Sequence, residues 1–272
     1  PRNNQRFLEK EKSISADIVC FDLEDSVPEK EKTKARKLIK SALKQRKHYS
    51  ANIYARTNSP ESGKIESDLK EIMQKGIDGI VIPKVNSAKE LKKIEKTIIS
   101  LEKKGKISGT RIIPSIESAL GVVNCYEIAC CSKRIDAVVF GIFDLLNDIG
   151  IEYTKGNPRG AKYARYKIPV DVTAAGVYAI DGIWQDIKDK SGLKKDCDVG
   201  RSLGYVGKSI IHPDQIETVH KIYHPNKNEI RWAKLVMKTY NSSTKKGKGA
   251  TVVDGKMIDE VHYKRAKALL EI

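Results

Sequence analysis

The stretch that decides the fold is Phe21-Asp22-Leu23-Glu24-Asp25-Ser26-Val27-Pro28. It continues an apolar run at residues 16–20, whose length is typical of a buried strand. Three acids close the run, and Pro28 ends the extended segment before a charged helical pattern begins. A buried strand that carries carboxylates at its C-terminal end is how parallel α/β folds present a site.

The same pattern recurs along the chain. Six further apolar runs each close on a polar or ionisable residue: 52–58, 79–85, 111–118, 136–143, 177–183 and 205–211. With the first run, they predict seven strands. Amphipathic helical patterns separate most of these runs, and Ser87 and Glu90 form a capping-box pattern before one of them. This alternation predicts a parallel sheet with right-handed crossovers.

The predicted fold is therefore α/β, and specifically a TIM (β/α)8 barrel, which takes about 250 residues. Such a barrel needs eight strands, so we expect the first strand to be missing from this sequence, before Pro1. We assign residues 1–241 to the barrel. Residues 242–272 are interpreted as a linker of small residues and lysines followed by a C-terminal helical lid segment.

Three segments carry more specific structural predictions. Residues 119–131 are expected to form one helix, and residues 152–160, rich in Gly and Pro, a loop. Pro169 predicts that the helix after this loop is short or interrupted. Residues 187–201 are polar, and we expect a loop with a short helix there.

The chain is strongly basic, with a net charge of +16 over 272 residues. This charge raises the possibility of nucleic-acid binding. The lysines are spread over helical faces, however, which favours a solvated surface. A basic rim that attracts an acidic substrate, such as a phosphate-bearing one, is compatible with both interpretations. We therefore expect no nucleic-acid partner. No apolar run approaches the roughly 20 residues of a membrane span, so we expect no membrane partner either.

The cysteines point to a reducing compartment. There are five, an odd number, and none forms a C-x-x-C pair. We therefore expect a cytoplasmic protein without disulfides or zinc.

Ionisable residues at the predicted strand ends are the candidates for chemistry. On one face of a barrel the following would converge: Glu24, Asp25, Arg56, Lys84, Glu117, Asp144 and Asp181. A carboxylate cluster with few histidines suits a hard cation such as Mg²⁺, and Glu117 and Asp144 end neighbouring strands, as direct ligands would. The alternative is that each acid caps the helix that follows it.

Arg56 and Lys84 are the two cationic residues among these candidates. Arg56 ends a run that should be buried, so it either pairs with Glu24 or Asp25 or binds a carboxylate or enolate oxygen of a substrate. Lys84 follows Pro83, and a salt bridge with a neighbouring acid is its simplest role.

An ordered set of motifs resembles one family. The motifs are Asp22-Leu23-Glu24-Asp25-Ser26-Val27, Arg56-Thr57-Asn58, Ile82-Pro83-Lys84-Val85, Ile116-Glu117-Ser118-Ala119-x-Gly121, Phe140-Gly141-x-x-Asp144-Leu145, Gly204-Tyr205-x-Gly207-Lys208-x-x-Ile211-His212-Pro213 and Gly255-Lys256-Met257-Ile258-Asp259. Together they look like the citrate lyase beta-subunit-like group of the HpcH/HpaI aldolase superfamily, whose relatives include malyl-CoA and citramalyl-CoA lyases.

The resemblance implies a magnesium-dependent carbon–carbon lyase. Its substrate would be a 3-hydroxyacyl-CoA thioester, such as citramalyl-, malyl- or citryl-CoA, divided into an acyl-CoA and a keto acid. By the same match Glu117 and Asp144 would ligate Mg²⁺, and Arg56 would contact a substrate oxygen.

The match also gives roles to the remaining residues. Glu24 would act with Arg56 in catalysis, and Asp25 and Lys84 would help to bind substrate beside the metal. Asp259 would be the acid/base residue, carried by a C-terminal segment that covers a neighbouring subunit's site. The last feature predicts a homo-oligomer, a trimer or a multiple of three.

Two rival functions remain open at this point. One is an HpaI-type pyruvate aldolase acting on free hydroxy-keto acids, a route that usually needs a histidine base near the metal. The other is a barrel that serves as a non-catalytic scaffold or basic binding protein.

Overall fold

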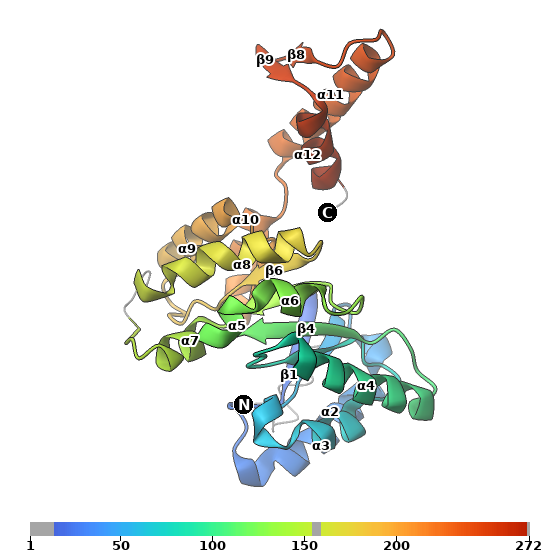
Figure 1. Cartoon of the computed structure of the whole chain (residues 1–272), viewed down its shortest axis with the longest axis vertical. Helices are drawn as coiled ribbons and strands as arrows, with labels where there is room; N and C mark the ends of the chain where they lie inside the picture. Colours follow the sequence, from blue (N-terminus) through green and yellow to red (C-terminus); the bar gives the residue numbers. More distant parts are fainter. Residues whose placement is uncertain (1–13, 154–158, 271–272) are drawn as a thin grey trace. The chain divides into compact units, whose positions relative to one another are not determined.

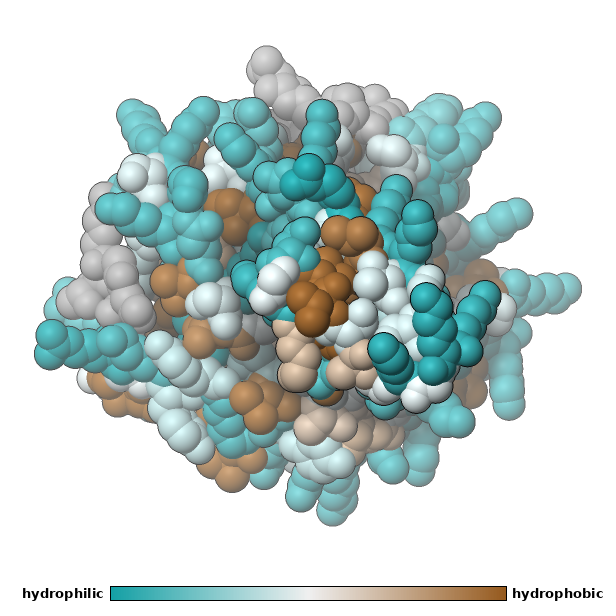
Figure 2. Space-filling view, turned by 90° about the horizontal axis from the view of Figure 1, so that it is seen from above, coloured by the Kyte–Doolittle hydropathy of each residue, from teal (hydrophilic) through white to brown (hydrophobic). Residues whose placement is uncertain are grey.

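The computed structural model describes residues 14–153 and 159–270, and the chain divides into two compact units. The larger unit extends to Ile216, and the smaller one covers Glu217–Ile272. None of the helices in the described ranges has the length and apolar character that a membrane-crossing helix requires. On the face shown in Figure 2, hydrophilic residues surround smaller groups of hydrophobic residues.

The larger unit contains one parallel sheet. Its seven strands are β1 Ile18–Asp22, β2 Asn52–Arg56, β3 Gly79–Ile82, β4 Arg111–Ile116, β5 Ala137–Phe140, β6 Tyr178–Asp181 and β7 Gly207–Lys208. Each strand pairs in parallel with the next one in sequence. This consecutive order is that of a (β/α) barrel, and all seven predicted runs contain a strand.

Helices connect the strands, as the sequence pattern predicts (Figure 1). They are α2 Lys32–Leu43, α3 Ile65–Ile72, α4 Ala88–Gly105, α5 Ala119–Val123, α6 Cys125–Cys130, α7 Ile142–Asp148, α8 Lys162–Ala174 and α9 Lys190–Leu203. Ser87 caps α4 by accepting a hydrogen bond from the Glu90 backbone nitrogen. α10 Ile216–Tyr223 begins at the last residue of the larger unit.

The two faces of the sheet are buried in different ways. Residues such as Phe21, Ile53 and Ile80 are fully buried on one face. The alternate positions form a second cluster around Tyr54 and Ile113, with partly buried neighbours. Side chains alternate between the faces of a strand, so Asp22 and Arg56 fall on the face of this second cluster, which places their charged groups at the edge of a partly open interior.

The prediction that Pro169 shortens or interrupts its helix is wrong. α8 runs through Pro169 for 13 residues. Proline has no N–H to donate to the carbonyl four residues earlier, which belongs to Arg165. The Tyr205 hydroxyl donates a hydrogen bond to that carbonyl at 3.1 Å instead. A side chain from outside the helix thus satisfies the carbonyl that proline leaves without its helical partner.

Two other local predictions need correction. Residues 119–131 form two short helices, α5 and α6, which meet at Asn124, and the Asn124 side chain donates to the Asn86 carbonyl at 2.8 Å. Residues 190–203 form the 14-residue helix α9, because Asp189 caps its start and Leu193, Cys197 and Gly200 supply a narrow buried stripe. In the predicted loop at 152–160, residues 154–158 lie outside the described ranges.

The smaller unit packs two helices and a hairpin together. It contains α11 Lys227–Thr244, the antiparallel pair β8 Thr251–Val253 and β9 Lys256–Ile258, and α12 Glu260–Leu270. Its core consists of Ala233, Val236, Val253, Ile258 and Ala266. The first three residues of the predicted linker continue α11, and the Ser243 hydroxyl donates to the Ala250 carbonyl at 3.1 Å. The lid role of this segment stays a prediction.

Candidate active site

The ends of five neighbouring strands bring the candidate residues together. Parallel strands present their C-terminal ends at one edge of a sheet, and the residues at that edge are Asp22, Glu24, Asp25, Arg56, Lys84, Glu117 and Asp144. Ion pairs and hydrogen bonds join most of them into one ionic cluster. Six of the seven residues predicted to converge are therefore found here, and Asp22 joins them although it was not predicted.

Arg56 lies flat against Asp22. The two residues are opposite each other in the register of β1 and β2, and Arg56 Nε and Nη2 donate to the two Asp22 carboxylate oxygens at 2.7 Å each. Burial alone would raise the pKa of Asp22, but the hydrogen bonds and charge of Arg56 outweigh it and lower that pKa to about 2. Asp22 was missed as a partner, although the equal strand-end positions of the two residues were the available signal.

Glu24 is the second partner of Arg56. Its Oε2 lies 3.0 Å from Arg56 Nη1, and its Oε1 lies 3.2 Å from Lys84 Nζ, at angles that do not meet hydrogen-bond geometry. The residue is only 3% exposed, and burial raises its pKa despite these two cations. One of the two predicted pairings of Arg56, the one with Glu24, is thus observed.

Lys32 holds the main chain on which Glu24 sits. Its buried ammonium donates to the carbonyls of Leu23 and Glu24 at 2.8 and 3.1 Å, and also to the Asn58 side chain. These hydrogen bonds hold the backbone of Leu23 and Glu24 in place and so determine where the acidic side chains after β1 point. Its position in a charged helical pattern gave no sign of this role.

Lys84 lies among three carboxylates. Its Nζ is 2.9 Å from Asp25 Oδ2, 3.2 Å from Asp144 Oδ1 and, as described, 3.2 Å from Glu24 Oε1. Burial alone would lower the pKa of Lys84, but the hydrogen bonds that Lys84 donates to Asp25 and Asp144, together with the charges of Glu24 and Asp144, outweigh it and raise that pKa. Its backbone has a φ of 53°, a conformation that costs a non-glycine residue on the order of 1–3 kcal/mol.

Glu117 is buried at the end of β4, where it rests on Gly141. A β-carbon added to Gly141 would lie 2.3 Å from Glu117 Cγ, so only glycine leaves room for this side chain. Burial first, and then the charges of Glu24 and Asp144, raise the pKa of Glu117 to about 7, although Ser115 and Arg56 oppose the shift. Its Oε2 has no hydrogen-bond partner among the described residues.

The cluster has the composition of a site for a divalent cation. Five carboxylates, those of Asp22, Glu24, Asp25, Glu117 and Asp144, face two cationic side chains, those of Arg56 and Lys84. A buried carboxylate oxygen without a partner costs free energy that a metal ion would recover. Oxygen ligands alone suit Mg²⁺, and Asp144 is 42% exposed, which leaves room for water or substrate beside it.

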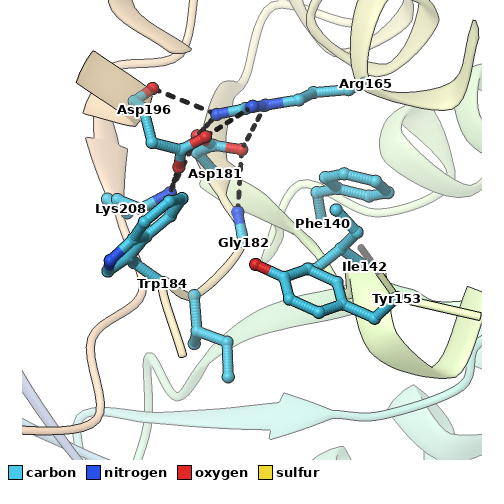
Figure 3. Close-up of a pocket in the computed structure, with 10 residues that line it drawn as sticks. Phe140, Ile142, Tyr153, Arg165, Asp181, Gly182, Trp184, Asp196 and Lys208 are labelled. Atoms are coloured by element: carbon cyan, nitrogen blue, oxygen red, sulfur yellow. Dashed lines mark hydrogen bonds and ion pairs between the residues drawn. The ribbon is translucent and has the colours of Figure 1, made fainter. Parts of the chain in front are cut away.

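Asp181 does not join this cluster, contrary to our prediction. Its carboxylate is shared by Arg165 from α8, Lys208 from β7 and the backbone nitrogen of Gly182, with Lys208 Nζ at 3.0 Å (Figure 3). Asp196 from α9 completes the network with contacts of 2.7 Å to Arg165 and 2.6 Å to Lys208. Two acids and two bases are thus neutralised together, beneath an apolar cleft lined by Phe140, Ile142, Ile183, Trp184 and Tyr153.

Asp259 belongs to the smaller unit and immediately precedes α12. Its Oδ1 accepts hydrogen bonds from the backbone nitrogens of Val261 and His262, and it lies 2.7 Å from His262 Nδ1. The bond with His262 is the main cause of its lowered pKa. Asp259 therefore acts as the helix cap that its position suggests, while the acid/base role given to it by the resemblance stays a prediction.

Almost the whole of the larger unit matches one family of known proteins. The sequence profile of the HpcH/HpaI aldolase/citrate lyase family matches residues 1–213. The chain belongs to this family. Among its HpcH/HpaI relatives, citrate lyase subunit beta of Leuconostoc mesenteroides subsp. cremoris is 34% identical over 100% of this chain and 90% of its own length.

Further members extend the comparison. The mitochondrial citramalyl-CoA lyase of Rattus norvegicus is 31% identical over 100% of this chain and 83% of its own length. A solved structure of CitE from Mycobacterium tuberculosis in complex with magnesium, acetoacetate and coenzyme A has a TM-score of 0.78 and 26% identity, and the match covers 100% of this chain and 94% of that one. The protein is thus an enzyme of the HpcH/HpaI lyase family, with the TIM-barrel-type fold that the sequence predicts.

Proposed function

We propose that the protein is a magnesium-dependent carbon–carbon lyase that cleaves or forms a 3-hydroxyacyl-CoA thioester. The reaction would interconvert citramalyl-, malyl- or citryl-CoA with an acyl-CoA and a keto acid. One observation carries the proposal. The strand ends of a chain of this family gather a surplus of carboxylates, including the partnerless Glu117 oxygen, around Arg56.

The names of the relatives support the substrate class. They include a citrate lyase beta subunit and a citramalyl-CoA lyase, and a related structure contains magnesium, acetoacetate and coenzyme A. Citramalyl-, malyl- and citryl-CoA share one chemical unit. In each, a carbon that bears a hydroxyl is bonded to a carboxylate and lies two bonds from the thioester carbonyl. The choice among them depends on a few atoms.

Glu117 and Asp144 are the residues that would hold Mg²⁺. Glu117 provides the buried oxygen without a partner, and Asp144 provides a half-exposed carboxylate that leaves the ion open to a substrate. The ion would supply Lewis-acid polarisation and a fixed orientation for the keto-acid end of the substrate.

The other residues of the cluster supply charge and position. Asp22 binds one edge of the Arg56 guanidinium and so holds Arg56 in place. The positive charge of Arg56 would stabilise the negative charge that develops on the thioester oxygen of the substrate. Glu24 pairs with Arg56 and is a candidate for catalysis with it. Asp25 and Lys84 would help to bind the substrate at the exposed side of the cluster.

Bond cleavage also needs a proton to move. The hydroxyl of the substrate loses a proton as the bond breaks, and the thioester enolate gains one to become the acyl-CoA. We propose Asp259 as the acid/base group for the enolate, contributed by a neighbouring subunit of a homotrimer. Val252 and Met257, a cross-strand pair of the hairpin before Asp259, are both 63% exposed, which suits a segment that docks on a second chain.

The rivals differ in measurable ways. No histidine is a hydrogen-bond or ion-pair partner of Glu117 or Asp144 in the part of the chain that the structure describes, so the observed geometry favours the thioester lyase over the free-acid aldolase.

The five cysteines are free thiols, and we propose a cytoplasmic location.

The test is turnover by the purified full-length chain. Citramalyl-, malyl- and citryl-CoA and the free hydroxy-keto acids would each be supplied with Mg²⁺ and with a chelator. We expect cleavage of at least one thioester that stops on chelation. Turnover of free acids alone would support the aldolase, and absence of any turnover would support the scaffold.

A further inference from the structure

Lys84 spans the candidate active site from one side to the other. Its ammonium contacts Glu24 and Asp25, which follow β1, and also Asp144, which lies in α7 after β5. These acids come from widely separated strands of the sheet. Among the ion pairs of the described residues, those of Lys84 connect the acids after β1 with Asp144, a candidate metal ligand.

The backbone around Lys84 is built to hold this position. Lys84 has left-handed backbone angles, and the next residue, Val85, is fully buried, with its nitrogen bound to the Ser115 carbonyl at 3.2 Å. The flexible part is the side chain, which is 31% exposed. The ammonium can therefore leave Asp144 by rotation of side-chain bonds alone, without any change in the fold.

We propose that Lys84 is an internal counter-cation that Mg²⁺ displaces from Asp144. The proposal rests on the magnesium assignment above and concerns how the site behaves before the metal arrives. An ammonium and a divalent ion compete for the same carboxylate oxygen, because each places positive charge within about 3 Å of it. Metal binding is then an exchange, in which Lys84 keeps Glu24 and Asp25 and releases Asp144.

A purely structural role of Lys84 predicts the opposite change in Mg²⁺ affinity. If Lys84 merely fastens the acids in the geometry that Mg²⁺ needs, its removal lets them separate, and the metal binds more weakly. If Lys84 competes with the metal, its removal leaves five carboxylates facing one cation, and the metal binds more tightly.

The experiment is a calorimetric titration of Mg²⁺ into the full-length, metal-free protein without substrate. We expect Lys84→Met to bind Mg²⁺ about tenfold more tightly than the wild type, because methionine is also unbranched and only one atom shorter, and it removes the charge. Lys64→Met is the matched control, since Lys64 pairs only with Glu29 among the ion pairs described and touches no candidate ligand. It should bind Mg²⁺ as the wild type does.

Thermal unfolding provides a second readout. Without Mg²⁺, Lys84→Met should melt below the wild type because its acids repel one another, and saturating Mg²⁺ should remove most of the difference. If Lys84→Met does not fold, Lys84→Gln takes its place in both measurements.

The outcomes separate this inference from the proposed function. Unchanged or weaker Mg²⁺ binding by the variant overturns the exchange and leaves the metal assignment intact. A wild type that binds no Mg²⁺ overturns both. Tighter binding by the variant, together with no turnover of any thioester by the wild type, supports the exchange and contradicts the lyase assignment.

Discussion

Arg56 and Asp22 face each other across β1 and β2, and two parallel hydrogen bonds of 2.7 Å join their side chains. This pair is the rigid part of the site, because a planar fork bound at two points cannot swing. It also means that the two interpretations of Arg56 are compatible, since one edge of the guanidinium is structural while its charge still faces the cluster.

The first prediction separates these two contributions. Arg56→Lys keeps the charge but loses the fork, so we expect turnover to fall by about 100-fold and the free energy of unfolding by about 2 kcal/mol. Arg111→Lys is the control, because Arg111 pairs with Asp136 at the opposite end of the strands. Full turnover with a lower melting temperature would show that Arg56 is only structural.

The second prediction concerns pH. The pKa of Asp22 is about 2 in the folded protein and 3.8 in its ordinary state, so ionised Asp22 stabilises the fold above about pH 4. This contribution, on the order of 2 kcal/mol, is lost as the pH falls from about 4 to 2. Asp22→Asn should therefore be less stable than the wild type at pH 6, and the difference should shrink toward pH 2. Parallel stability curves for the two proteins would contradict the assignment.

The third prediction tests the metal ligands. Glu117→Gln and Asp144→Asn each remove a negative ligand, and we expect Mg²⁺ affinity to fall at least tenfold in each. Without metal, Glu117→Gln should be as stable as the wild type or more stable, because the wild-type carboxylate is buried near two other acids. Asp148→Asn is the control. Asp148 is the last residue of α7, and its carboxylate accepts a hydrogen bond from the backbone nitrogen of Ala119 at the start of α5. Wild-type affinity in both variants would show that the ligands lie elsewhere.

The fourth prediction tests the shared site. Asp259→Asn and Glu117→Gln should each be nearly inactive, and mixed oligomers refolded from both should regain activity. Some sites would then combine an intact barrel from one chain with an intact Asp259 from another. Asp254→Asn, a change at the hairpin turn between β8 and β9, is the control for Asp259→Asn. A fully active monomer would refute the shared site.

The fifth prediction concerns the buried network around Asp181. The side chain of Lys208 is only 1% exposed and pairs with Asp181 and Asp196, so Lys208→Met should lower the free energy of unfolding by about 3–5 kcal/mol. Lys194→Met removes an exposed pair with Asp198 on α9 and should change it by less than about 1 kcal/mol. Mg²⁺ affinity of folded Lys208→Met should be unchanged. Equal losses of stability in the two variants would mean that the network contributes little.

The sequence predicted the parts of the fold that depend on the pattern of apolar residues and on the ionisable residues at the strand ends. Seven apolar runs gave seven strands in consecutive order, and their ends brought Glu24, Arg56 and Lys84 together. Asp22 was missed as the partner of Arg56 because strand register is a relation between two segments, which a single run of residues does not show.

The failures have a common physical origin. The local pattern at α9 is mostly polar, and its three buried residues need a neighbouring surface to become a stabilising stripe. Asp181 occupies a strand end like the other acids, but its partners Arg165 and Asp196 come from helices whose positions are set by packing. In each case tertiary contacts override what neighbouring residues suggest.

The hydrogen bond from Tyr205 to the Arg165 carbonyl makes the effects of two distant positions depend on each other. Tyr205→Phe removes the donor and should be costly while residue 169 is proline. In a Pro169→Ala background, the amide of residue 169 can bind the same carbonyl, and Tyr205→Phe should then be much less harmful. The residue at position 169 therefore determines which residues position 205 tolerates. Tyr205→Phe is expected to be tolerated after Pro169→Ala and to destabilise the fold if it comes first.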